Sequence, residues 1–322
     1  MRATVVGAGV VGLTTALTLA ERGARVTLLE RSRELGGNAS WLAGGMLAPF
    51  CEGESAPQSV VALSLAAIDW WDARVPGVTR EGTLVVAPPR DASEIDRFAA
   101  RTTAHAPADE GRIAQLEPDL AGRFRKGLFF ADEGHLDPRI ALSALTERLR
   151  AKGGDVRFGV DGEALGDAKV VIDCRGWAAR KALPELRGVR GEMMRIRSHE
   201  VNLTRAVRFL HPRIPLYIVP RANDEFMIGA TMIESAERGP VSVRSAVELL
   251  SAAYALHPAF GEAEILEMSA DVRPAYPDNE PRIEERGNRI FVNGFYRHGF
   301  LLAPAFAQRA ATLAFERSKA LV

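Results

Sequence analysis

The fold of this chain is decided by the stretch Arg2–Arg31, RATVVGAGVVGLTTALTLAERGARVTLLER. Its first apolar run, Ala3–Val6, is short and β-rich, and a helical apolar period follows it as far as Gly23. A second β-rich run, Arg25–Leu29, ends in Glu30. The order strand, tight turn, helix, strand predicts the first unit of a Rossmann-like parallel sheet.

The turn between this strand and this helix has the pattern Gly-x-Gly-x-x-Gly, formed by Gly7, Gly9 and Gly12. Gly7 permits a tight turn, Gly9 lets a pyrophosphate approach the backbone, and Gly12 lets the helix lie against its strands. The helix N-terminus offers N–H groups to phosphate, and Glu30 stands near the distance at which a carboxylate meets a ribose hydroxyl. Because the strand, the three glycines, the helix and Glu30 all occur at the expected spacing, the pattern favours dinucleotide binding. The alternative is a βα turn that contains glycines and binds no nucleotide.

Composition is that of an ordinary globular protein. The chain has 322 residues, 47% hydrophobic and 25% charged, enough for one large domain or two interleaved ones. Lys+Arg and Asp+Glu number 41 each, so no net field favours nucleic acid or a membrane surface. No apolar run could span a bilayer and the chain starts on a strand, which predicts a cytoplasmic protein. Two cysteines and scattered histidines predict no metal site.

Strands of the buried, parallel type occur in three separated blocks: at the start, at Val156–Phe158 with Lys169–Ile172, and at Arg289–Asn293. From Gly191 the pattern alternates as antiparallel strands do, with a hairpin turn at Ala222–Asp224. The sequence therefore predicts an α/β fold in which a second, α+β domain built on an antiparallel sheet is inserted into a discontinuous nucleotide-binding domain. The predicted bounds are residues 1–80, 137–190 and 270–322 for the nucleotide-binding domain, and 81–136 and 191–269 for the inserted one.

Helical periodicity predicts further helices. They cover Val60–Arg74, a segment that Asp91 opens and that runs to about Ala104, Pro138–Lys152 after the cap Asp137, Val243–Leu256, and a last helix from about Ala305.

Several longer blocks occur in an order that resembles one enzyme family. They are VVGAGVVG, ASWLAGGMLAP, LYIVPR, MIGATMIES, VRPAYPDNEPRI and NGFYRHGFLLAPA, and together they cover nearly the whole chain. The order is similar to that of FAD-dependent D-amino acid oxidase-like enzymes, most of all the glycine oxidases of thiamine biosynthesis. The resemblance implies a Rossmann-like FAD-binding domain, and makes the inserted domain the substrate-binding one.

The resemblance also implies the residues that hold FAD. Its pyrophosphate and ribose would meet the glycine-rich turn, Val10, Val11, Glu30 and Arg31. The isoalloxazine would lie against Ala39, Ser40, Gly44, Gly45 and Met46, and against the backbone of Phe295, Tyr296, Arg297, His298, Gly299, Phe300 and Leu301. Val160 is assigned to the adenine, although the segment after it is shorter than in the family. Independently of the resemblance, Gly176 is expected to lie against the nucleotide, because it follows a strand of the parallel type. A loop before a helix can supply backbone donors where negative charge gathers on the reduced ring.

On the substrate side, the resemblance gives Arg273 the role of gripping a carboxylate, which a planar guanidinium matches bidentately. Tyr217 would add its hydroxyl to the same carboxylate, and Arg297 would face the substrate with its backbone carbonyl placed to accept from the amino group. Met46 and Met232 would limit the space beside Cα. For Arg273 taken alone, a surface ion pair is the alternative.

The implied reaction is oxidative deamination of glycine, and of sarcosine or small D-amino acids, by FAD and dioxygen. Products are glyoxylate or a 2-oxo acid, ammonia and hydrogen peroxide, and no side chain acts as a catalytic acid or base. The imine would supply the thiazole part of thiamine, a link to thiazole synthase, and a homo-oligomer is expected. Two alternatives stay open: a D-amino acid or sarcosine oxidase of another pathway, and a non-catalytic flavin-binding subunit, against which Arg273 together with Tyr217 argues.

Overall fold

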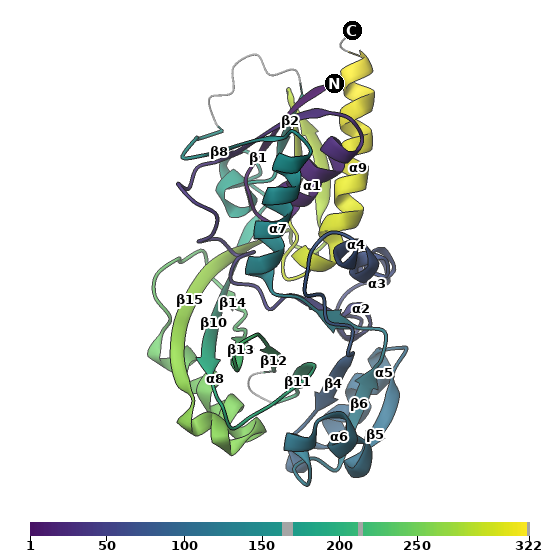
Figure 1. The fold of residues 1–322 in the computed structure, drawn as a ribbon, viewed down its shortest axis with the longest axis vertical. Helices are drawn as coiled ribbons and strands as arrows, with labels where there is room; N and C mark the ends of the chain where they lie inside the picture. The colour runs from purple at the N-terminus through teal and green to yellow at the C-terminus, as the bar shows by residue number, and fades with distance from the viewer. Residues whose placement is uncertain (163–169, 212–214, 321–322) are drawn as a thin grey trace.

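The computed structural model describes residues 1–162, 170–211 and 215–320, so the predicted strand start at Lys169 lies outside the described residues. Within these ranges the chain forms two large sheets, at opposite ends of the molecule in Figure 1. A short ladder of β3 (Met46–Leu47) and β7 (Gly134–His135) lies apart from both sheets.

The first sheet has six strands in the order β16-β17-β9-β1-β2-β8. Their bounds are β1 (Arg2–Val6), β2 (Arg25–Glu30), β8 (Asp155–Phe158), β9 (Val171–Asp173), β16 (Arg282–Arg286) and β17 (Arg289–Asn293). All neighbours are parallel except β16, which runs antiparallel to β17. Val5, Leu28 and Ile172 are completely buried, as expected of parallel strands whose two faces are both covered. The predicted parallel sheet, assembled from separated parts of the chain, is confirmed.

Three helices lie beside this sheet: α1 (Val10–Glu21), α7 (Pro138–Ala151) and α9 (Gly299–Ala320). The helix α1 packs against both of the others, and Figure 1 shows α1 next to the long C-terminal α9. Asp137 caps α7 as predicted, because its Oδ1 accepts a hydrogen bond from the Arg139 N–H at 2.7 Å.

The second sheet has nine strands, in the order β14-β10-β13-β12-β11-β4-β6-β5, with β15 also paired to β10. Their bounds are β4 (Thr83–Val86), β5 (Ala106–Asp109), β6 (Lys126–Phe130), β10 (Arg187–Arg197), β11 (Ala206–Phe209), β12 (Leu216–Pro220), β13 (Glu225–Gly229), β14 (Ile233–Glu234) and β15 (Glu264–Ala275). The pairs are antiparallel apart from β11 with β4. Asn223 and Asp224 join β12 to β13 with φ of 61° and 55°, the left-handed conformation of a two-residue hairpin turn.

The helices near the second sheet are α5 (Ser93–Arg101), α6 (Glu110–Leu116) and α8 (Val243–Leu256). The bounds of α8 are those predicted, and its Leu249 and Leu256 are buried in one core with Ile196 and Ile218 of the sheet. The predicted cap at Asp91 is wrong, because Asp91 lies in a short 3-10 turn and the helix begins at Ser93.

The predicted single helix Val60–Arg74 is instead two helices, α3 (Gln58–Ser64) and α4 (Ala67–Asp72), which follow the short α2 (Pro49–Glu52). The Ser64 hydroxyl donates to the Val60 carbonyl at 2.6 Å at the point where α3 ends. A hydroxyl that bonds back to the preceding turn competes with the helical ladder and bends it, which periodicity alone does not reveal.

The last helix begins at Gly299, six residues before the predicted start at Ala305, and runs through Pro304. A proline inside a helix leaves the carbonyl four residues earlier without its usual donor. Here that carbonyl belongs to Phe300, and the Trp71 side chain donates its indole N–H to it at 2.8 Å. A tryptophan from α4 therefore supplies the hydrogen bond that the proline removes from α9.

The long strand β15 connects the two sheets. At its end, the Tyr296 N–H donates to the Pro274 carbonyl at 2.8 Å, and Ala275 forms a bridge with Phe295. Arg273 is thereby set beside the turn that precedes α9. We propose that the two sheets are the cores of the two predicted domains. Among the described residues, no helix has the length and apolar character needed to cross a membrane.

Candidate active site

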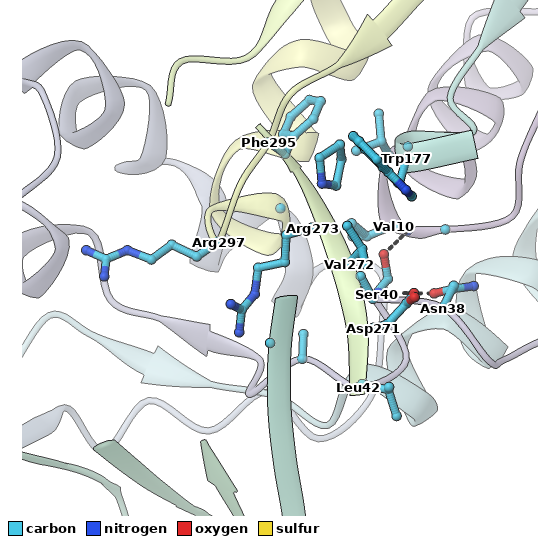
Figure 2. A pocket seen from close by; sticks show the side chains of 18 of the residues that line it. Val10, Asn38, Ser40, Leu42, Trp177, Asp271, Val272, Arg273, Phe295 and Arg297 are labelled. Carbon is cyan, nitrogen blue, oxygen red and sulfur yellow. Dashed lines mark hydrogen bonds between the residues drawn. The ribbon is translucent and has the colours of Figure 1, made fainter. Parts of the chain in front are cut away.

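A cavity of about 640 Å³ lies between the two sheets. Its walls include the carboxyl ends of β1, β2, β9 and β17 and, from the second sheet, residues of β10, β11, β12 and β15. The outer edge of a parallel sheet, at the carboxyl ends of its strands, is where α/β folds bind ligands. Figure 2 shows the cavity from close by, with the Arg273 and Arg297 side chains extending in different directions.

One end of the cavity is formed by backbone donors. Gly9, Val10 and Val11, at the start of α1, line it, and the N-cap residue Gly9 has no side chain that could cap the helix. The first N–H groups of a helix have no partner within the helix, so they are available to an anion. The Ser40 hydroxyl accepts from the Val10 N–H at 3.0 Å. The remaining donors form a cradle suited to a pyrophosphate.

Glu30 lines the same end of the cavity and is fixed by two backbone groups. Its Oε2 accepts from the Ala8 N–H at 2.7 Å, and its Oε1 from the Ser32 N–H at 2.9 Å. Each carboxylate oxygen can accept a second hydrogen bond, so this rigid group can still accept from a ribose hydroxyl.

Gly12 lies behind this cradle and does not line the cavity. A Cβ on Gly12 would lie 1.8 Å from the Gly7 carbonyl oxygen, and one on Gly7 would lie 2.8 Å from the Cys174 carbonyl oxygen. The backbone of the glycine-rich turn therefore contacts both the start of α1 and the end of β9. Only glycine permits such close contact at positions 7 and 12.

Glycines also surround the Tyr217 ring in the middle of the cavity. A Cβ on Gly44 would lie 2.4 Å from Tyr217 Cε2, and one on Gly229 would lie 2.9 Å from its hydroxyl oxygen. Burial raises the pKa of the Tyr217 hydroxyl, with the Arg273 charge acting in the opposite direction. The phenol is therefore neutral at physiological pH and can donate a hydrogen bond.

Arg273 brings a half-buried positive charge to the substrate side of the cavity. Its Nη1 donates to the Thr231 carbonyl oxygen at 3.0 Å, and no carboxylate among the described residues is paired with it. Desolvation lowers the pKa of this guanidinium, yet an arginine stays charged in proteins. A partly desolvated cation that faces a cavity without a carboxylate partner is a site for an anionic ligand.

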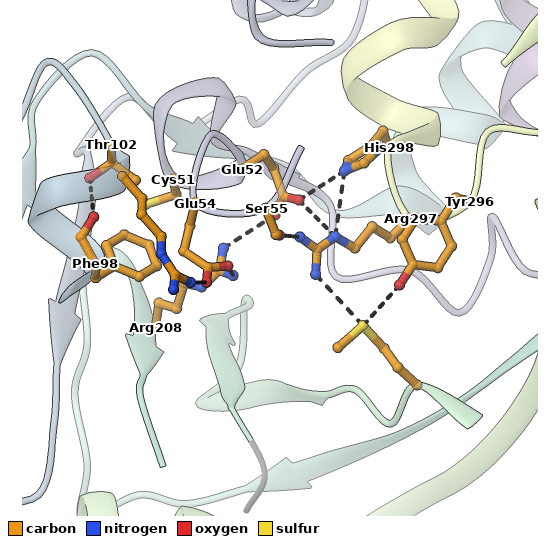
Figure 3. A network of polar contacts seen from close by, with 12 residues as sticks. Cys51, Glu52, Glu54, Ser55, Phe98, Thr102, Arg208, Tyr296, Arg297 and His298 are labelled. Atoms are coloured by element: carbon orange, nitrogen blue, oxygen red, sulfur yellow. Dashed lines mark hydrogen bonds and ion pairs between the residues drawn. The ribbon is translucent and has the colours of Figure 1, made fainter. Parts of the chain in front are cut away.

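Glu52 is a cavity residue that the sequence analysis missed. It ends α2, and Figure 3 shows its carboxylate between Arg297 and His298. Glu52 Oε2 lies 2.8 Å from Arg297 Nε and 2.9 Å from His298 Nε2, and Oε1 lies 3.2 Å from Arg208 Nη1. Burial opposes ionisation of Glu52, but Arg297, His298 and Arg208 hold the pKa of its carboxyl well below the usual range.

Most of the predicted site residues come together in this cavity. Those that line it are Gly7, Gly9, Val10, Val11, Glu30, Arg31, Ala39, Ser40, Gly44, Gly45, Met46, Gly176, Tyr217, Met232, Arg273, Phe295, Tyr296, Arg297, Gly299, Phe300 and Leu301. Gly12, Val160 and His298 are not among the lining residues. Val160 donates its N–H to the Glu30 carbonyl at 3.0 Å, and His298 bonds to Glu52 instead.

The residues missed by the sequence analysis, besides Glu52, include Asn38, Trp177, Arg208 and Asp271. Asn38 offered a local signal, since its Oδ1 accepts from the Ser40 and Trp41 N–H groups in an Asx-type turn. Arg208 and Asp271 stand in ordinary alternating strands, so no signal in the sequence marks which face of the sheet meets the cavity.

A buried acid behind the site gives a test of pH dependence. Glu133 is completely buried and accepts from the Cys51 N–H at 2.7 Å, and burial raises the pKa of its carboxyl from 4.5 to about 7. As pH rises through this range, the unfolded chain loses a proton that the folded chain keeps, so stability falls until about pH 7. Glu133→Gln is expected to remove this pH dependence. Relative to wild type, its free energy of unfolding should increase by about 2–3 kcal/mol between about pH 5 and pH 8.

Urea unfolding at both pH values measures the effect. Glu147→Gln, on the exposed side of α7, is the matched control, and its stability is expected to follow the wild-type pH curve. If the curve of Glu133→Gln also runs parallel to that of wild type, the buried carboxyl does not hold its proton near neutral pH.

A dinucleotide cradle at the end of a parallel sheet, joined in one cavity to an unneutralised guanidinium on a second sheet, is the arrangement of a cofactor-dependent oxidoreductase. The family model DAO, described as FAD dependent oxidoreductase, matches residues 2–313. The chain belongs to this DAO family of FAD-dependent oxidoreductases.

Three relatives match nearly the whole chain. A protein of Rhizobium etli named as a thiamine biosynthesis oxidoreductase, ThiO, is 57% identical over 97% of this chain and 95% of its own length. A bifunctional protein ThiO/ThiG of Synechocystis is 28% identical over 97% of this chain, which spans 51% of that protein. A glycine oxidase of Pseudomonas aeruginosa is 29% identical over 97% of this chain and 94% of its own.

Solved structures show the same fold. The crystal structure of glycine oxidase from Geobacillus kaustophilus matches with a TM-score of 0.80 and 23% identity, covering 98% of this chain and 95% of that one. The residues present also fit FAD, because the backbone at the start of α1, the fixed Glu30 carboxylate and the small residues Gly44 and Gly45 line one continuous cavity.

Proposed function

We propose that this protein oxidises glycine, and sarcosine or small D-amino acids, as an FAD-dependent amine oxidase. The observation that carries the proposal is the Arg273 guanidinium, half-buried in the cavity wall and without a carboxylate partner among the described residues, beside the Tyr217 ring. A carboxylate is the ligand that a planar guanidinium and a neutral phenol bind best together. A flavin-binding subunit without turnover would have no use for such a group.

In the proposed complex, Arg273 and Tyr217 hold the substrate carboxylate, and the Arg297 backbone carbonyl accepts from the amine. Met46 and Met232 limit the space beside Cα, since both line the cavity and Met232 Sδ lies 3.2 Å from the Tyr296 hydroxyl. Residues 39–46 and 295–301 would hold FAD, which would supply the acceptor for a hydride from Cα. These chain residues contribute by orientation, which alone can supply a large part of the rate.

The imine product would be hydrolysed to glyoxylate and ammonia, and dioxygen would be reduced to hydrogen peroxide. The names of the relatives support glycine as substrate and thiamine biosynthesis as the setting. The fusion named ThiO/ThiG supports a functional link to thiazole synthase, to which the imine would pass. The predicted homo-oligomer and the cytoplasmic location stay predictions.

The proposed function is tested on the purified protein with FAD. Hydrogen peroxide release from glycine, sarcosine, D-alanine and D-proline is measured with a coupled peroxidase. Glycine or sarcosine oxidation supports the proposal, and faster turnover of D-proline or D-alanine favours a D-amino acid oxidase. A flavin-loaded protein that oxidises none of them overturns it.

Gly191 offers a way to move the Arg273 guanidinium without changing its chemistry. A Cβ on Gly191 of β10 would lie 2.3 Å from Arg273 Cζ and Nη2, so the side chain end must shift while the backbone stays. Gly191→Ala is expected to raise KM for glycine about 10- to 100-fold, since misplacing a binding group by about 1 Å has effects of this size.

The flavin spectrum and the melting temperature of Gly191→Ala should match those of wild type. Gly239→Ala is the matched control, because a Cβ there meets nothing within 4 Å. An unchanged KM in Gly191→Ala would mean that the position of the Arg273 guanidinium does not matter for substrate binding.

A further inference from the structure

The cavity contains more positive charge than a substrate with one carboxylate requires. Arg208, Arg273 and Arg297 all line it. They stand on different segments, β11, β15 and the turn before α9. Two of the three, Arg208 and Arg297, are ion-paired with the Glu52 carboxylate at 3.2 Å and 2.8 Å. Arg273 is the one that has no carboxylate partner among the described residues.

These groups act on each other through one electrostatic field. The Arg297 charge contributes to lowering the pKa of Arg273, and the Glu52 charge contributes to raising the pKa of Tyr217. The Glu52 carboxylate therefore lies within Coulombic range of the residues proposed to hold the substrate. In a cavity of low dielectric, such interactions are much stronger than in water.

Neighbours fix the Glu52 carboxylate in place. Its side chain is only 16% exposed, and Arg208, Arg297 and His298 bind it from two sides, as Figure 3 shows. Arg297 is held further by the Ser55 hydroxyl at 2.6 Å from its Nη2. Neither arginine can turn to a second ligand without breaking an ion pair that is shielded from water.

We infer that Glu52 is a specificity-determining residue that restricts this site to substrates with a single carboxylate. It is ion-paired with Arg208 and Arg297, so that of these three guanidinium groups only Arg273 lacks a carboxylate partner among the described residues, and it presents its own negative charge to a second acidic group. A dicarboxylic amine such as D-aspartate would place that group near the Glu52 charge, where Arg208 and Arg297 are already ion-paired. The inference rests on the proposed function and specifies the substrate charge at the same site.

A purely structural role for Glu52 makes a different prediction. Glu52 joins α2 to β11 and to the turn before α9, so its loss could weaken the oxidation of every substrate. In that case kcat/KM would fall by the same factor for all substrates. A role in specificity changes the ratio between an acidic substrate and its neutral isostere, which a structural role leaves unchanged.

The test compares D-aspartate with D-asparagine, which have nearly the same shape and differ in the charge of the side chain. Wild type is expected to oxidise D-asparagine with the higher kcat/KM. In Glu52→Gln the ratio of D-aspartate to D-asparagine should rise about tenfold or more, because one like charge is removed and Arg297 is freed. The double variant Glu52→Gln with Arg297→Gln should lose most of that gain.

The matched control is Glu54→Gln. Glu54 also lies near Arg208, at 4.0 Å, but does not line the cavity, so the ratio in this variant should equal that of wild type. A ratio in Glu52→Gln that equals the wild-type ratio overturns the inference. An enzyme that oxidises neither glycine nor D-asparagine contradicts the proposed function instead, so the two failures are distinguishable.

A measurement on the wild-type holoenzyme covers the case in which Glu52→Gln does not fold. Malonate and its monoamide are titrated while the flavin absorption is followed, at alkaline pH where both acids are fully ionised. Malonate monoamide is expected to bind about tenfold or more tightly than malonate, because it lacks the second negative charge. Equal affinity for the two overturns the inference without any variant.

Discussion

Arg273→Met is expected to lower kcat/KM for glycine by about 100- to 1,000-fold, because truncating one member of a buried, hydrogen-bonded charge pair costs 2–5 kcal/mol or more. Most of the loss should appear in KM, since the guanidinium would bind the carboxylate in the ground state and in the transition state alike. Steady-state kinetics with peroxide detection measure the effect.

The stability of Arg273→Met should not fall with its activity, and we expect it to stay the same or increase. Arg273 is a half-buried cation without a carboxylate partner among the described residues, and the free protein bears the cost of its partial desolvation. Methionine of similar length removes that cost, and the melting temperature should equal or exceed that of wild type, as often happens when a functional residue is replaced.

The Arg273→Met result is interpreted with two further measurements. The flavin spectrum must be retained, which shows that the cofactor is bound. Arg90→Met is the control, since Arg90 is an exposed residue whose surface ion pair with Asp91 contributes little. Normal glycine kinetics in Arg273→Met would remove this residue from the substrate site.

Gly12→Ala is expected to destabilise the protein and to weaken FAD binding together. A Cβ at this position would lie 1.8 Å from the Gly7 carbonyl oxygen and 3.0 Å from its carbon, and backbone cannot give way as a side chain can. The start of α1 must move away from β1, which costs about 1–3 kcal/mol or more in packing. The turn that cradles the pyrophosphate moves with it, so the dissociation constant of FAD should rise about tenfold or more.

Thermal unfolding of the FAD-free protein and flavin fluorescence titration measure the two effects. Gly111→Ala provides the matched control, because it lies in the helix α6 with no atom nearer to its added Cβ than 3.6 Å. That substitution should leave FAD affinity unchanged and is expected to be neutral or stabilising. Tight FAD binding by Gly12→Ala would show that this glycine is not needed for the cradle.

Predictions from the sequence were most accurate where a pattern is local. The strand, turn and helix of Arg2–Arg31, the Asp137 cap, the Asn223–Asp224 turn and the exact span of α8 all follow from propensities within one segment. The sequence missed features that depend on a distant partner. The early start of α9 relies on Trp71, which satisfies the Phe300 carbonyl, and no pattern within the helix records that hydrogen bond.

The candidate site divides in the same way. The sequence by itself determined the glycine-rich turn, Glu30 and, through resemblance, Arg273 and Tyr217, because motifs keep their spacing along the chain. Only the tertiary structure decided that Glu52 pairs with Arg208 and Arg297 and that Arg273 is left without a carboxylate partner among the described residues. The physical reason is that the charge state of a cavity depends on distances between segments far apart in the chain. Folding sets those distances, and each segment taken alone carries no record of them.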